Sequence, residues 1–68
     1  MKISARNQFK GVVTNVNEGA VNDIVTLDTK LGLVSSTISK NAVNELKLTV
    51  GKEAYAIIKA TSVMVGIE

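Results

Sequence analysis

The sequence of 68 residues contains no cysteine, histidine, proline or tryptophan, and its only aromatic residues are Phe9 and Tyr55. The absence of cysteine and histidine excludes disulfides, thiolate nucleophiles, zinc fingers and imidazole bases. Six carboxylates remain, but their spacing does not suggest an acid and base couple. No glycine-rich loop precedes a Lys-Ser or Lys-Thr pair, so no phosphate loop is expected. The sequence therefore predicts a binding protein and not an enzyme.

Positive charge is present but not clustered. The eight basic residues stand singly along the chain, and the net charge is +2. Proteins that bind single-stranded nucleic acid combine a basic groove with aromatic side chains on which bases stack, and neither is evident here. The N-terminal stretch MKISARNQ has no apolar run, so we expect no signal peptide, no membrane association and a cytoplasmic location.

Valine, isoleucine and threonine make up 22 of the 68 residues, a bias that favours strands. The spacing of apolar residues and turns predicts five strands, at Gln8–Val16, Ala20–Thr29, Leu33–Ser39, Glu53–Lys59 and Ser62–Ile67. At Asn41–Leu46 the spacing of apolar residues changes to that of a helix, and Ser39 and Asn41 are its candidate N-caps. Gly11, within the first strand, marks a bulge or a close-packing point. We therefore predict a single all-β domain over residues 1–68, an OB-like five-stranded small barrel with one short helix between strands 3 and 4.

The short chain limits the core that it can form. A domain of this size buries only about 60% of the surface that its unfolded chain exposes, and it usually needs additional support. Without disulfides or large aromatic anchors, the expected support is self-association into an oligomer in which aliphatic residues of several chains share one core. The alternative is an elongated monomer with unusually good packing.

Two short stretches are rich in hydrogen-bond donors and contain no carboxylate. In Ser4–Asn7, an extended backbone places the Ser4 hydroxyl and the Arg6 guanidinium on one face, and Lys59–Ser62 offers a cation, two hydroxyls and backbone N–H groups. Such donors suit a small, fully ionised oxyanion such as molybdate, tungstate or sulfate, whereas phosphate carries a proton and gains from an acceptor. The same residues also occur as ordinary surface charges and turn hydroxyls, so residue types alone leave both interpretations open.

Four segments of the chain match a pattern known from other proteins: Ser4–Gly11, Gly19–Asn22, Thr37–Ser39 and Gly51–Met64. The pairing of the SARNQ opening with a late KATSVM is the most specific feature of this pattern. In these segments, and over essentially its whole length, the sequence resembles the molbindin (Mop) family of small cytoplasmic molybdate- and tungstate-binding proteins.

The resemblance implies an OB-like barrel that assembles as a homohexamer, a trimer of dimers, with oxyanions bound at subunit interfaces. By motif position, the anion is expected to contact Ser4, Ala5, Arg6, Ser39, Lys59, Ala60, Thr61 and Ser62, with Arg6 and Lys59 supplied by different chains. A second class of site is expected near the three-fold axis, for which the candidates are Gly19, Ala20, Val21 and Asn22. No residue is expected to ligate a metal cation directly.

One position departs from the family pattern, which has another serine three residues after Ser39. This chain has Ala42 there, and the missing hydroxyl would weaken the site by about 0.5–1.5 kcal/mol if the serine reached the anion.

The function implied by the resemblance is reversible binding of molybdate or tungstate for intracellular storage and homeostasis. The alternatives are an OB-fold protein that binds single-stranded nucleic acid, and a sensory module that acts through a partner protein. Mop-like domains also occur fused to regulators and transport ATPases, but this sequence encodes no such segment, which favours storage.

Overall fold

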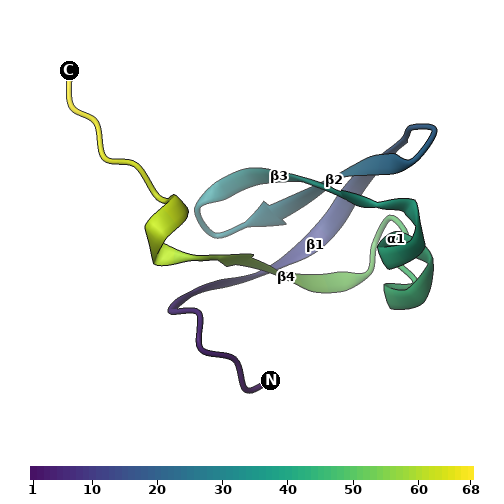
Figure 1. Cartoon of the computed structure of the whole chain (residues 1–68), viewed down its shortest axis with the longest axis horizontal. Coiled ribbons are helices and arrows are strands. Elements are labelled where there is room, and N and C mark those ends of the chain that lie inside the picture. Colours follow the sequence, from purple (N-terminus) through teal and green to yellow (C-terminus); the bar gives the residue numbers. More distant parts are fainter.

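The computed structural model describes all 68 residues as a curled antiparallel sheet with one short helix at one end (Figure 1). The strand order in the sheet is β3-β2-β1-β4, so β3 and β4 are its two free edges. None of the helices is long and apolar enough to cross a membrane. The elements are β1 (Asn7–Glu18), β2 (Asn22–Thr29), β3 (Gly32–Ser39), α1 (Lys40–Leu46), β4 (Glu53–Ile58) and a 3-10 turn at Ala60–Ser62.

The central strand β1 pairs with β2 on one side and with β4 on the other. Gly11 is a close-packing point, as predicted, because a Cβ added there would lie 2.7 Å from the carbonyl oxygen of Asp28 on β2. The irregularity in register falls slightly later, between Val13 and Asn15. A bulge there increases the local twist and helps the long strand to curl.

The hydrophobic core is small. Only eight of the 68 residues are buried, and five of them form the core cluster: Val13, Val25, Leu27, Val43 and Ala56. Val25 and Leu27 alternate along β2, as inward-facing positions of a half-buried strand should. Many aliphatic side chains remain exposed, and contiguous exposed apolar surface is typical of interaction sites.

Helix α1 confirms the predicted helix and begins one residue earlier, at Lys40. Ser39 is its N-cap: the Ser39 hydroxyl oxygen accepts a hydrogen bond from the backbone N–H of Ala42 at 3.1 Å. The helix ends at Leu46, and its C-cap residue Lys47 adopts a left-handed conformation (φ 54°). Val43 is its only buried residue, so one turn of the helix covers one end of the sheet.

The fifth predicted strand, Ser62–Ile67, is not formed within the chain. After β4 the backbone makes the 3-10 turn, and the remaining residues extend away from the sheet (Figure 1). A strand is stabilised by hydrogen bonds to a neighbouring strand, and this segment has no neighbour in its own chain. The OB-like all-β fold is therefore as predicted, but with four strands and two free edges where a closed barrel would have five strands.

Candidate functional site

The two donor stretches that are far apart in sequence lie at the same end of the sheet. Strands β1 and β4 are antiparallel, and their outermost pair joins Asn7 to Ile58. Arg6 and Lys59 are the next residues beyond that pair, so both emerge where the chain enters β1 and leaves β4 (Figure 1). Residues opposite each other in such a ladder are about 5 Å apart at Cα, close enough for both cations to reach one small anion.

Neither cation is paired with a carboxylate. The salt bridges of the structure involve Lys10 and Lys40, whereas Arg6 and Lys59 are exposed and form none. A guanidinium and an ammonium without acidic neighbours favour the approach of an anion.

The N-terminal stretch is tethered to the sheet by a side-chain hydrogen bond. The amide nitrogen of Gln8 donates to the carbonyl oxygen of Ala5 at 2.6 Å, which fixes the backbone between Ser4 and Arg6. On the other stretch, Ser62 N–H donates to Lys59 C=O at 2.9 Å and closes the 3-10 turn. Both stretches therefore present their hydroxyls and cations from ordered backbone.

Ser39 lies elsewhere, at the far end of the sheet. It pairs with Asn22, beside the turn that leaves β1, whereas Arg6 precedes the start of β1. The twelve residues of β1 separate these ends by roughly 30 Å at the usual rise per strand residue. One chain thus does not bring Ser39 to Arg6 and Lys59, and only a second copy could. Because its oxygen accepts from Ala42 N–H, the exposed Ser39 hydroxyl keeps its own proton available for donation.

The turn proposed as a second site, Gly19–Asn22, is joined to the start of α1. The backbone N–H of Lys40 donates to the carbonyl oxygen of Val21 at 2.9 Å, and Ser39 pairs with Asn22. The structure therefore gathers Ser39 and all four residues of this turn at one end of the molecule. The two groups of candidate residues occupy opposite ends of the sheet.

A charge cluster around the buried carboxylate of Asp23 fixes this second end, and sequence analysis did not identify it. Asp23 is only 1% exposed, and its carboxylate accepts from Gly19 N–H at 3.1 Å and lies 3.0 Å from Lys40 Nζ. Lys40 Nζ also lies 3.3 Å from Glu18 Oε1. We call Glu18, Asp23 and Lys40 the turn clamp. Asp23 lies on the same inward-facing side of β2 as Val25 and Leu27. A carboxylate in such an alternating pattern is the signal in the sequence that could have indicated a charge partner for it.

The turn clamp changes the protonation equilibria of its members. The hydrogen bond from Lys40 lowers the pKa of Asp23, with Gly19 N–H acting in the same direction and burial opposing both. The hydrogen bond to Asp23 raises the pKa of Lys40. Asp23 and Lys40 are therefore both charged near neutral pH, and Lys40 offsets the negative charge beside the turn.

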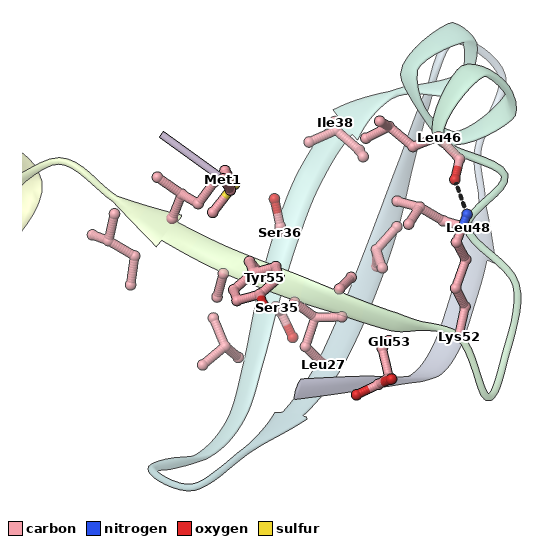
Figure 2. Close-up of a pocket in the computed structure, with 16 residues that line it drawn as sticks. Met1, Leu27, Ser35, Ser36, Ile38, Leu46, Leu48, Lys52, Glu53 and Tyr55 are labelled. Atoms are coloured by element: carbon pink, nitrogen blue, oxygen red, sulfur yellow. Dashed lines mark hydrogen bonds between the residues drawn. The ribbon is translucent and has the colours of Figure 1, made fainter. Parts of the chain in front are cut away.

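A wide apolar cavity beside the edge strands is not suited to an oxyanion. It encloses about 720 Å³ between β3, β4 and the loop after α1, and twelve of its sixteen lining residues are hydrophobic. Figure 2 shows Tyr55, Leu27 and Leu48 around it. Its one cation, Lys52, donates a hydrogen bond to the carbonyl oxygen of Leu46 (Figure 2). A doubly charged anion would lose its hydration here for few donors in return.

The chain matches the family model of the TOBE domain over residues 3–65. It is 65% identical over 69 residues to a probable molybdenum-pterin-binding protein of Haemophilus influenzae, and the match covers 100% of both chains.

Two solved structures have closely similar folds. The structure of MopII from Clostridium pasteurianum is 40% identical, covers 97% of this chain and 100% of its own, and gives a TM-score of 0.91. The cytoplasmic molybdate-binding protein ModG, in a crystal form with molybdate bound, is 42% identical with a TM-score of 0.94, and the match covers 100% of this chain and 49% of ModG. The chain therefore belongs to the TOBE-domain family and is similar to the small Mop proteins within it.

Proposed function

We propose that this protein binds molybdate or tungstate reversibly, without catalysing a reaction, and stores the ion in the cytoplasm. The observation that carries the proposal is the pairing of β1 with β4, which places unpaired Arg6 and Lys59 and the hydroxyls of Ser4, Thr61 and Ser62 at one end of the sheet. The similarity to ModG, whose structure contains molybdate, supports the choice of anion, and its description as cytoplasmic supports the location.

The donor set also favours this class of anion on chemical grounds. Molybdate and tungstate are fully ionised at neutral pH, so a site made only of donors satisfies all their oxygens. Hydrogen phosphate carries a proton that needs an acceptor, and neither Ser4–Asn7 nor Lys59–Ser62 contains a carboxylate. This difference supports discrimination against phosphate.

The proposal includes assembly as a homohexamer, a trimer of dimers, with the anions at subunit interfaces. A site that combines Ser39 with Arg6 and Lys59 requires two copies, because the chain holds these residues at opposite ends of the sheet. A single chain presents both cations at one end, whereas the family resemblance assigns them to different chains. Two symmetric copies that meet at this end would supply Arg6 from one chain and Lys59 from the other, and Ser39 would then come from a further copy of the hexamer.

The nucleic-acid alternative has no comparable support. Phe9 is half-buried and packs against the core, so only Tyr55, which is 48% exposed beside the apolar cavity, could stack on a base. The two aromatic residues therefore do not form an exposed stacking surface along a basic groove. Only the OB-like fold supports the hypothesis that the protein binds nucleic acid.

Native mass spectrometry tests the proposed function directly. We expect a hexamer that gains discrete molybdate masses and does not gain sulfate supplied at the same concentration, because the smaller sulfate tetrahedron would make longer and weaker contacts with donors spaced for molybdate. Phosphate serves as a second control for the donor-only site. A protein that remains monomeric and gains no molybdate would contradict both the assembly and the choice of anion.

A mobility titration with labelled single-stranded DNA separates the two functions. We expect no saturable binding at low salt, because the chain lacks the stacking surface and the basic groove that supply the affinity of such proteins. Micromolar binding that weakens steeply with added salt would instead favour the nucleic-acid function.

A further inference from the structure

Gln8 is the only glutamine of the chain, and its side chain reaches back to the N-terminal donor stretch. Its amide nitrogen donates to the carbonyl oxygen of Ala5 at 2.6 Å. Gln8 itself belongs to β1, where it pairs with Ile57 of β4, and both Gln8 and Ala5 are half-buried. The hydrogen bond therefore fastens a peptide that lies outside the sheet to a residue that the sheet holds in place.

The Ala5 carbonyl is a group that an anion site must turn away. A fully ionised oxyanion offers only acceptors, and a carbonyl oxygen is itself an acceptor with partial negative charge. Ala5 lies between Ser4 and Arg6, the two residues of this stretch whose side chains are expected to donate to the anion. A free Ala5 carbonyl could rotate toward the anion and repel it. The Gln8 amide occupies this carbonyl and holds it on the Gln8 side.

The same hydrogen bond sets the direction of the Arg6 backbone N–H. The Ala5 carbonyl and the Arg6 N–H belong to one peptide, and the chain has no cis peptide bond. The C=O and N–H of a planar trans peptide point in opposite directions. A carbonyl fixed toward Gln8 therefore directs the Arg6 N–H away from Gln8.

This N–H is also free to donate. Arg6 precedes β1, and its N–H takes part in none of the eight backbone hydrogen bonds that lie outside the helices and strands. Arg6 is exposed, so a ligand can reach its backbone. An unpaired, oriented N–H beside a guanidinium is a suitable donor pair for an anion.

We propose that Gln8 is a positioning residue of the anion site, which turns the Ala5 carbonyl away from the anion and points the Arg6 N–H toward it. The inference rests on the proposed function. Arg6 then contributes through its backbone as well as its guanidinium, and Ala5, which has no polar side chain, contributes through the orientation of its peptide. Donors that are fixed before the anion arrives lose little freedom when it binds.

Calorimetric titration of Gln8 variants with molybdate tests the proposal. Gln8→Leu keeps the size of the side chain and removes the donor, so we expect binding about 2- to 10-fold weaker than in the natural protein. Gln8→Glu has the same shape but sets a charged acceptor against the Ala5 carbonyl, and it should bind more weakly still. Gln8→Asn is one methylene too short and should resemble Gln8→Leu. Thermal unfolding without molybdate verifies that each variant is folded.

NMR of isotope-labelled protein separates positioning from a merely structural role. In the natural protein, molybdate should move the amide proton signal of Arg6 downfield, because a hydrogen bond to an anion deshields the proton. In Gln8→Leu saturated with molybdate this displacement should be largely lost. The carbonyl carbon signal of Ala5 should change in Gln8→Leu even without molybdate, because its donor is gone. A changed Ala5 signal with an intact Arg6 displacement would overturn the positioning role.

The matched control is Thr14→Val, which also removes a side-chain hydrogen bond to a backbone carbonyl while it keeps the side-chain shape. Thr14 Oγ1 donates to the carbonyl oxygen of Thr26 at 3.3 Å, away from the end of the sheet where Arg6 lies. This variant should retain the natural affinity and the natural Arg6 displacement. An equal loss in Thr14→Val and Gln8→Leu would contradict the proposal, since general loosening of the sheet would then explain both.

The measurements distinguish failure of this inference from failure of the proposed function. A natural protein that binds no molybdate would reject the proposed function and the positioning role together. If the natural protein binds molybdate and Gln8→Leu binds it as tightly, with the same displacement of the Arg6 signal, the proposed function stands and the role of Gln8 is overturned.

Discussion

Replacement of Arg6 or Lys59 by alanine is expected to weaken molybdate binding about 10- to 100-fold for each variant, the loss associated with one hydrogen bond to a charged group. Both cations lie at the β1–β4 end of the sheet and neither has a carboxylate partner. Removing either one takes away a charge-assisted contact without leaving an unpaired acidic group. Isothermal titration calorimetry with molybdate measures the change.

Two further variants show whether the effect comes from the site or from net charge. Lys30→Ala removes the same charge from the exposed turn between β2 and β3 and should leave the affinity nearly unchanged. Arg6→Lys keeps the charge but loses the planar fork of donors, so an intermediate affinity is expected. If Arg6→Ala and Lys59→Ala both bind molybdate as tightly as the natural protein, these residues do not form the site.

Replacement of Lys40 by methionine is expected to destabilise the fold strongly at neutral pH. Asp23 is 1% exposed, and Lys40 Nζ at 3.0 Å is its cationic partner. Without Lys40, the carboxylate stays buried next to Glu18 and has only the Gly19 N–H as a donor. Thermal unfolding should show a lower midpoint than for Lys10→Met, which breaks only the exposed bridge to Glu53.

The pH dependence of stability provides a sharper test of the turn clamp. In the natural protein the pKa of Asp23 lies below its ordinary value of 3.8, so its contribution is complete above that pH and is lost as the pH falls through the lowered pKa. The pKa of Lys40 lies above its ordinary value of 10.5, so its contribution is complete below that pH and is lost as the pH rises through the raised pKa.

At acidic pH, the dependence of stability on pH should reverse in Lys40→Met: lowering the pH should stabilise this variant. Burial then dominates and raises the pKa of Asp23, so that protonation on acidification relieves the unpaired charge and stability increases. Lys40→Arg keeps a cation and should retain the natural profile, and adding Asp23→Asn to Lys40→Met should recover part of the lost stability. An unchanged acid profile in Lys40→Met would show that Lys40 does not compensate Asp23.

The separation of the two candidate regions was not accessible to sequence analysis. Ser39 and Arg6 both belong to segments that resemble the same family site, and their residue types do not show where they lie in a chain. The register of β2 with β3 places Ser39 beside Asn22, whereas the register of β1 with β4 places Arg6 near Lys59. Strand pairing joins residues that are tens of positions apart, and local patterns do not specify such partners.

The sequence by itself determined the local elements and the class of chemistry. Alternation of residues such as Val25 and Leu27 encodes a half-buried strand, and Ser39 encodes the start of α1, because these preferences act over a few residues. The donors in Ser4–Asn7 and Lys59–Ser62 are compatible with an anion site, and the resemblance of the whole chain to the molbindin family turned this possibility into a prediction.

Only the tertiary structure decided what happens to Asp23 and to the C-terminal tail. The alternation that predicts a strand at Ser62–Ile67 is present, but after the 3-10 turn at Ala60–Ser62 the segment runs away from the free edges of its own sheet and pairs with neither. Asp23 is a polar residue in the sequence, yet folding brings Lys40 to it from 17 positions away and makes its burial possible. Strand pairing and charge compensation both require a second group, and the fold determines which group is near.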